Sequence, residues 1–163
     1  MSNEELLKMY EAIKADPGEL VRAAARKRLI NFARYMQPDL ALEPFHVVYY
    51  TLLDMFAHGK IRKMIVQMPP QHGKSEGSSR KTPAFMLGLD PDKKICIGSY
   101  AATIARDFNR DVQRIIDTPS YRELFPETFL NGSNVVTMAN TYLRNSDVIE
   151  MVGHKGSLRV VGR

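Results

Sequence analysis

The chain of 163 residues contains no tryptophan and a single cysteine, Cys96. One cysteine excludes an intramolecular disulfide and any metal site built from cysteines alone, and it is typical of a reducing compartment. No apolar run approaches the roughly 20 residues that a membrane-spanning helix needs. The N-terminus, Met1 to Glu5, is acidic where a secretory signal would be basic and then apolar. We therefore expect a soluble, cytoplasmic protein without a membrane partner.

The composition is that of an ordinary globular domain, because 44% of the residues are apolar and 25% are charged. This length suits one domain with a real core. The net charge of +5 suits a polyanionic partner. Composition alone leaves open whether that partner is a nucleic acid.

Residues 1–58 are predicted to form an N-terminal helical segment. A first helix follows Ser2 and carries Leu6, Tyr10 and Ile13 at helical spacing. A second helix starts at Asp16-Pro17, and its apolar stripe continues to Met36. A third helix runs from Pro44 and ends at Gly59. The third helix is expected to bury Phe45, Val48, Leu52, Leu53 and Phe56 and to expose Asp54. The basic cluster Arg22, Arg26 and Lys27 on the second helix is either a solvated face or a contact to a nucleic-acid backbone.

From residue 59 onward, strand-like and helical patterns alternate. The expected strands are 61–68, 94–99, 134–139, 148–152 and 157–161, and the expected helices are 74–87, with Pro83 as a possible break, and 101–117. Cys96 falls in a strand of the buried type, which favours a packing role. Because parallel strands need crossover helices, this order predicts an α/β fold with a parallel sheet.

The segment that carries chemistry is Pro69-Pro70-Gln71-His72-Gly73-Lys74-Ser75, between the first expected strand and its helix. It matches the end of the phosphate-binding loop pattern, in which glycine allows a close turn and backbone amides face a phosphate. Lys74 would contact the β- and γ-phosphates, and the Ser75 hydroxyl would bind Mg²⁺. The first glycine of the full pattern is absent, since Met68 stands in its place. The strand–loop–helix context nevertheless favours a nucleotide site over a fortuitous loop.

No apolar strand ending in Asp follows Lys74, although a nucleoside triphosphatase needs such an acidic element for its metal and water. The sequence also ends on the strand-like run Val160-Val161-Gly162-Arg163. We therefore expect a fragment that binds nucleotide weakly and does not turn it over by itself.

The order of these motifs resembles the large subunit of tailed-bacteriophage terminases over about residues 28–163. The resemblance rests on Phe45-His46, the Pro-Pro-Gln-His-Gly-Lys-Ser-Glu loop ending at Glu76, the junction Ser99-Tyr100-Ala101 and the closing Arg159 to Arg163. It implies a P-loop NTPase-type three-layer parallel sheet, incomplete here, with an N-terminal helical segment (1–58), and C-terminal β strands within an N-terminal part of the ATPase domain (59–163). It implies ATP and Mg²⁺ bound by Gln71, His72, Gly73, Lys74, Ser75 and Glu76, with Phe45 and His46 near the adenine and Lys74 as the catalytic residue.

The same resemblance implies an ATP-driven motor that packages double-stranded DNA in the host cell cytoplasm. Its partners would be a portal protein, a small terminase subunit and further copies of the chain. Two alternatives stay open from the residues: a helicase-like or DNA-repair ATPase, and a basic nucleic-acid-binding module without ATPase activity. The first shares the loop, whereas the second predicts DNA binding that does not depend on Lys74.

Overall fold

The computed structural model describes residues 16–132 and 141–163 and, before them, Ser2, Glu4, Leu7, Tyr10, Glu11 and Lys14. The expected strand 134–139 lies outside the described residues, and so do Leu6 and Ile13 of the expected first helix. Within the described part, no helix is both long and apolar enough to cross a bilayer.

The helices of the N-terminal part are α2 (Glu19–Lys27), α3 (Leu29–Met36) and α4 (Pro44–Ala57). The prediction of one continuous helix to Met36 is wrong, because the chain is extended at Arg28, with φ −134° and ψ 127°. The break has a tertiary cause. The backbone amide of Leu29 donates to the Asp54 carboxylate of α4 over 2.8 Å, which caps the start of α3.

Helix α4 has the predicted bounds, and Gly59 beyond its end is in the left-handed region at φ 73°. Its buried face differs from the expected one. Tyr49, Tyr50, Leu53, Asp54 and Ala57 are buried, whereas Phe45, Val48, Leu52 and Phe56 are among the exposed large apolar residues. Asp54 was expected to be exposed and is only 7% exposed.

A helical run from Lys74 contains the π-helical turn η1 (Glu76–Lys81) and the helix α5 (Thr82–Leu89). Pro83 does not break this run. It is the second residue of α5 and an interior position of the helical run, directly after the π-helical turn. The hydrogen bonds of this π-helical turn join residues five apart, instead of the four of an α-helix.

The remaining elements are β1 (Lys94–Ser99), α6 (Ala102–Ile116), α7 (Pro119–Leu124), β2 (Val148–Glu150) and β3 (Ser157–Gly162). The α/β class and the C-terminal strands are confirmed. The described strands form one sheet in the order β1-β3-β2, with β1 parallel and β2 antiparallel to β3. The all-parallel prediction is therefore wrong, because the short connection between Glu150 and Ser157 permits only an antiparallel return.

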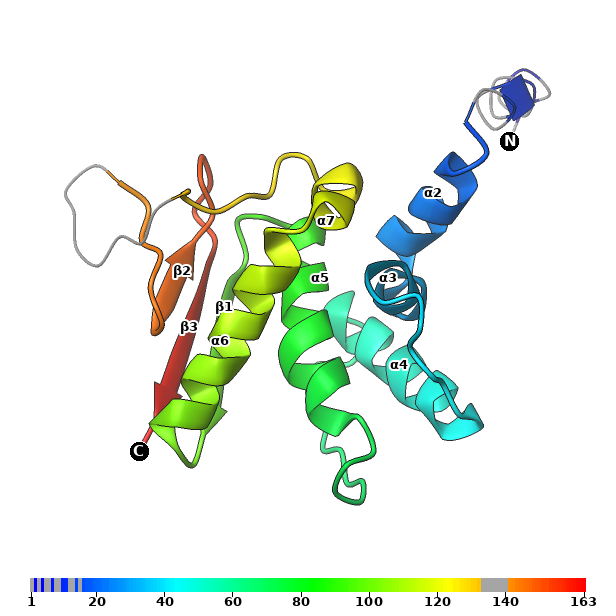
Figure 1. Ribbon diagram of the computed structural model, residues 1–163. Coiled ribbons are helices and arrows are strands. Elements are labelled where there is room, and N and C mark those ends of the chain that lie inside the picture. Colours follow the sequence, from blue (N-terminus) through cyan, green and yellow to red (C-terminus); the bar gives the residue numbers. More distant parts are fainter. Residues whose placement is uncertain are drawn as a thin grey trace.

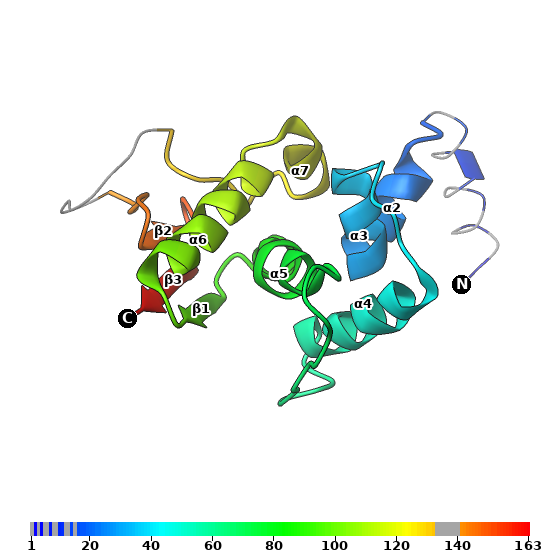
Figure 2. The same ribbon diagram turned by 60° about the horizontal axis from the view of Figure 1, so that its bottom comes forward.

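Helix α6 covers one face of this sheet (Figures 1 and 2). On β1, Ile95 and Ile97 are partly buried and pack against the core, whereas Cys96 between them is exposed. The packing role expected for Cys96 is wrong, because strand alternation turns it to the opposite face. Arg159 and Val161 of β3 are exposed as well, so the described residues form two layers rather than three.

The expected strand 61–68 is extended but pairs with no strand in the described part of the chain. Its side chains still alternate, since Met64, Val66 and Met68 pack against the core and Ile65 is 90% exposed. The predicted strand is therefore wrong for the described part of the chain, because the segment has the side-chain alternation of a strand without a hydrogen-bonded partner. One core joins the N-terminal helices to the rest, with Phe32 of α3 5.4 Å from Phe85 of α5 and 6.1 Å from Tyr121 of α7, centroid to centroid.

Candidate nucleotide site

The loop Pro69–Glu76, here called loop 69–76, follows the extended segment and leads into the helix that starts at Lys74. Two of its residues are in the left-handed region, Gln71 at φ 63° and Gly73 at φ 71°. Among the described non-glycine residues only Gln71 has a positive φ. A bulkier residue than glycine at position 73 would be strained, and its Cβ would also stand 3.4 Å from the ring Nε2 of His46. These two residues turn the chain sharply before the helix.

Helix α4 holds the backbone of this loop. The amide of Glu43 donates to Nδ1 of His46 over 2.9 Å, so the ring carries its proton on Nε2 and donates it to the carbonyl of His72 at 3.3 Å. One turn further along α4, the Tyr49 hydroxyl donates to the carbonyl of Lys74 over 2.6 Å. Burial raises the pKa of Tyr49 above its ordinary value, which keeps this donor protonated.

The start of the helix also packs tightly against α4. A Cβ at Gly77 would stand 2.6 Å from Cε1 of Tyr49, so glycine is required for this close approach. The Ser78 hydroxyl donates to the Lys74 carbonyl over 2.9 Å. Helix α4 thus fixes the loop by hydrogen bonds and the start of the following helix by close contact.

What the loop leaves free is a set of donors. The backbone amides of Gly73, Lys74 and Ser75 have no acceptor within the described residues. The Lys74 side chain is exposed and makes no ion pair in the part of the chain that the structure describes. Amides at a helix start, next to a free ammonium, form a donor set that suits an anion.

Glu76, the last residue expected in the site, is engaged elsewhere. Its carboxylate oxygens lie 3.3 Å from Nζ of Lys81 and 3.6 Å from the guanidinium of Arg80. Arg80 in turn pairs with Asp111 of α6 over 2.6 Å. The carboxylate is therefore neutralised by these cations rather than by the loop.

Two cavities flank loop 69–76. A cavity of about 600 Å³ contains Lys74 and Ser75, Met64 and Val66 of the extended segment, Ser99 and Tyr100 after β1, and Phe108 of α6. A cavity of about 370 Å³ on the other side contains Phe45, His46, Gln71, His72, Gly73, Glu43 and Glu76. The rings of Phe45 and His46 lie 4.0 Å apart and those of Phe45 and His72 5.8 Å apart. The structure thus places Phe45 and His46 beside the loop, and their contact with an adenine stays a prediction.

The basic cluster on α2 lies outside both cavities and is largely neutralised. Arg22 pairs with Asp16 and Glu19, and Arg26 pairs with Glu19. Lys27 is exposed and has no ion pair in the described part of the chain. These acidic partners precede the basic residues in sequence. The sequence prediction considered only the segment between the basic residues, so it did not include their ion pairs.

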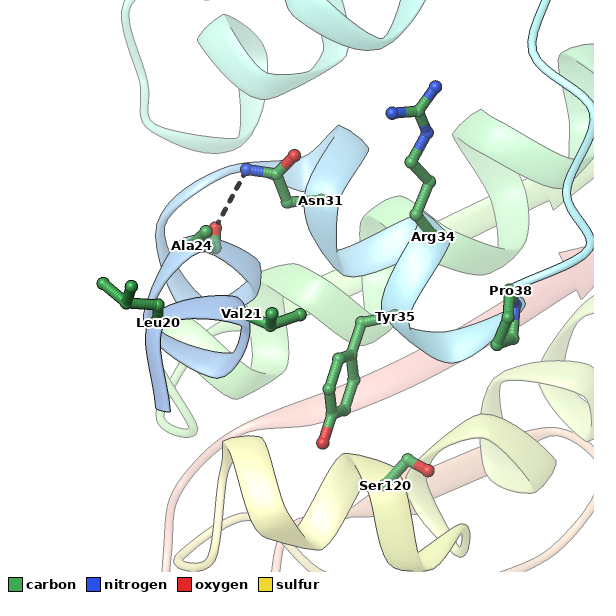
Figure 3. A pocket seen from close by; sticks show the side chains of 8 residues that line it. All are labelled: Leu20, Val21, Ala24, Asn31, Arg34, Tyr35, Pro38 and Ser120. Carbon is green, nitrogen blue, oxygen red and sulfur yellow. Dashed lines mark hydrogen bonds between the residues drawn. The ribbon is translucent and has the colours of Figure 1, made fainter. Parts of the chain in front are cut away.

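A third cavity, of about 700 Å³, is separate from the loop. It lies where α2, α3 and α7 meet and is lined by Leu20, Val21, Ala24, Asn31, Arg34, Tyr35, Pro38 and Ser120 (Figure 3). The Tyr35 hydroxyl donates to Glu123 over 2.6 Å, and Asn31 reaches back to the carbonyl of Ala24. This third cavity contains none of the free amides described above. The volume of a cavity therefore does not identify the anion site.

Sequence reasoning did not identify Tyr49, Ser78, Ser79 or Phe108 as parts of the site. Tyr49 and Ser78 donate hydrogen bonds to a backbone carbonyl of the loop. Any residue type has that carbonyl, so these contacts produce no sequence motif. Ser99 and Tyr100, which the resemblance had singled out as a junction, line the cavity that contains Lys74. In the described residues, no group of His, Cys, Asp and Glu is arranged to hold a metal ion by itself.

No protein-family model, curated protein or solved structure matches this chain. The case for a function therefore rests on the geometry of loop 69–76 and its neighbours.

Proposed function

We propose that loop 69–76 binds the phosphates of ATP and that the chain is the ATP-binding part of a motor of the terminase large-subunit type. One observation supports the proposal: two left-handed residues turn the chain directly before a helix start at which consecutive amides have no acceptor in the described residues and Lys74 is exposed. The terminase assignment itself, with double-stranded DNA, a portal and a small subunit as partners, rests on the sequence resemblance.

The residues present fit a nucleotide with its metal. Gly73 provides a turn that a Cβ would strain, Lys74 provides an ammonium, and Ser75 provides a hydroxyl at the start of the helix. Mg²⁺ would supply charge neutralisation of the phosphates, with the Ser75 hydroxyl as its protein ligand. The adjacent rings of Phe45 and His46, tilted by 36° to each other, offer a surface for a purine base.

The same cavities argue for binding rather than fast hydrolysis. No carboxylate of the described residues lines the cavity that contains Lys74 and Ser75. Glu76, the nearest acidic residue in sequence, is paired with Lys81 and Arg80. A nucleoside triphosphatase needs an acidic element near the phosphates for its metal and its attacking water. We expect hydrolysis by this chain to stay at background.

The proposal is tested by equilibrium binding of a fluorescent ATP analogue with Mg²⁺. Lys74→Ala should weaken binding roughly 10- to 100-fold, because a hydrogen bond to a charged group contributes about 1.5–3 kcal/mol. Gly73→Ala should also weaken binding, since a side chain strains the left-handed backbone at φ 71°. Lys27→Ala is the matched control, an exposed lysine on α2 outside both cavities, and should bind like the wild type.

Circular dichroism checks that each variant is folded. A folded Lys74→Ala variant with wild-type affinity would refute the nucleotide site. That result, together with intact DNA binding, would favour a nucleic-acid-binding module.

A further inference from the structure

A second cluster of cations lies at the other end of the extended segment from the loop. We call it the amino-end patch: Lys60, Arg62, Lys63, Lys93 and Lys94. Arg62 and Lys93, from different parts of the sequence, line one cavity of about 530 Å³. Lys60, Lys63 and Lys94 are their exposed neighbours along the chain. The N-terminal ends of segment 61–68 and of β1 thus bring these cations together.

The charge of this patch is not compensated within the described residues, where none of its members makes an ion pair. Two aspartates that precede Lys93 in sequence accept hydrogen bonds from backbone amides. Asp90 accepts the amide of Asp92 over 3.1 Å, and Asp92 accepts the amide of Lys155 over 2.7 Å. Asp54 is buried and lies 3.4 Å from Arg28. The arginines of α2 are paired by contrast, so free positive charge gathers here rather than on α2.

The cavity between these cations has an apolar floor. It is formed by Phe56, Ala57, Ile61, Met86 and Leu89. Phe56 is 36% exposed and Leu89 38% exposed, so water reaches both side chains. A groove for unpaired nucleotides combines cations with an exposed aromatic ring, because the phosphates contact the cations and a base stacks on the ring. Both are present at this cavity.

We propose that the amino-end patch binds single-stranded nucleic acid. A duplex hides its bases in the stack, and an acidic peptide brings carboxylates without a flat ring, so neither would cover the Phe56 floor. The proposal goes beyond the proposed function, because its ligand is a single strand and not the double-stranded DNA of the motor. It does not require loop 69–76 to bind nucleotide, and the two cavities meet at Phe56, which lines both of them.

The experiment is a fluorescence-anisotropy titration of the full chain with a labelled single strand, repeated over a range of salt concentrations. The triple variant Lys60→Gln, Arg62→Gln and Lys63→Gln should bind at least tenfold more weakly at low salt. Its slope of log affinity against log salt should be shallower by about 2, because each lost phosphate contact removes about 0.7.

The matched control is Lys27→Gln, Arg34→Gln and Arg122→Gln, which removes the same charge from exposed residues of α2, α3 and α7. It should keep the wild-type slope. Equal losses in the two triple variants would overturn the proposal, because net charge alone would then explain binding. Tighter binding of the duplex, or equal competition by polyglutamate, would overturn the choice of ligand.

Lys74→Ala separates this proposal from the nucleotide site. It should leave strand binding unchanged while it weakens ATP binding. Loss of strand binding in Lys74→Ala would place the strand at loop 69–76 and overturn the amino-end patch.

Discussion

At the scale of single residues, the side chains around loop 69–76 act on its backbone. His46 donates to the carbonyl of His72, and Tyr49 and Ser78 both donate to the carbonyl of Lys74. Fixing the carbonyls leaves the amides and the Lys74 ammonium available for a ligand. Gln71 adopts a left-handed conformation that non-glycine residues rarely occupy, at a cost of roughly 1–2 kcal/mol. Such strain persists only where the surroundings enforce it.

Tyr121 gives a prediction about pH. It is fully buried, its hydroxyl donates to the carbonyl of Ala84 over 2.8 Å, and burial raises its pKa far above the ordinary value. The folded state therefore keeps the phenol protonated while the unfolded state ionises near pH 10, so the unfolding free energy falls as the pH rises above that value. Each such tyrosine contributes a slope of about 1.4 kcal/mol per pH unit.

The measurement is urea denaturation at several pH values around the ordinary tyrosine pKa. Tyr121→Phe should cost about 1 kcal/mol at neutral pH by leaving the Ala84 carbonyl without its donor. Above the ordinary tyrosine pKa, the unfolding free energy of Tyr121→Phe should fall less steeply with pH than that of the wild type. The difference in slope should be the contribution of one tyrosine. Identical slopes would contradict the protonated, buried state of Tyr121.

At the scale of elements, α4 organises the N-terminal half. Its His46 and Tyr49 hold loop 69–76, and its Asp54 caps α3 and pairs with Arg28. Asp54 also lies 3.7 Å from His58 at the end of the same helix. One helix thus sets the break between α2 and α3 and the position of the candidate site.

Asp54→Ala should lower the unfolding free energy by about 2 kcal/mol, because it removes the cap of α3 and leaves the buried amide of Leu29 without an acceptor. Asp54→Asn keeps an acceptor oxygen and should cost less. Asp107→Ala is the control, since Asp107 is exposed and pairs only with Arg110 of the same helix turn. Urea midpoints give the order, and equal midpoints for Asp54→Ala and Asp107→Ala would refute the capping role.

The boundaries of α4, β1, α6 and β3 follow closely from capping residues, glycines and apolar periodicity. The buried face of α4 could not be predicted in this way, because apolar residues occur all round the helix. Packing against neighbouring elements decides that Tyr49, Tyr50 and Leu53 are buried. The break at Arg28 was also not predicted, since the stripe from Val21 to Met36 has no interruption. A carboxylate from another helix decides it.

At the scale of the whole molecule, the helices and one face of the sheet form a single core, and the other face of the sheet stays exposed in the described residues. Cys96, Arg159 and Val161 lie on that face, and Ile65 of the neighbouring extended segment is exposed as well. Within the sheet, β3 has partners on both sides, whereas β1 has one.

Hydrogen exchange should follow this arrangement. The amides of Leu158 to Val160 in β3 should exchange most slowly, because the strand is paired on both edges and packs under α6. The amides of 64–68 should exchange fast, since none of them has an acceptor in the described residues. Exchange followed by mass spectrometry measures both segments. Protection of 64–68 equal to that of β3 would show that the segment has a ladder partner.

The sequence by itself determined the local features: the α/β alternation, the ends of most elements, and a glycine and a lysine placed where a strand-like run meets a helix. These follow from neighbouring residues, because capping, turn conformation and periodicity are properties of short stretches of chain. Only the tertiary structure decided which faces are buried, which way β2 runs, where α2 ends and which cations keep their charge free. Those outcomes depend on residues far apart in the sequence, as Asp54 with Leu29 and Arg62 with Lys93 show, and a linear pattern does not contain their contacts.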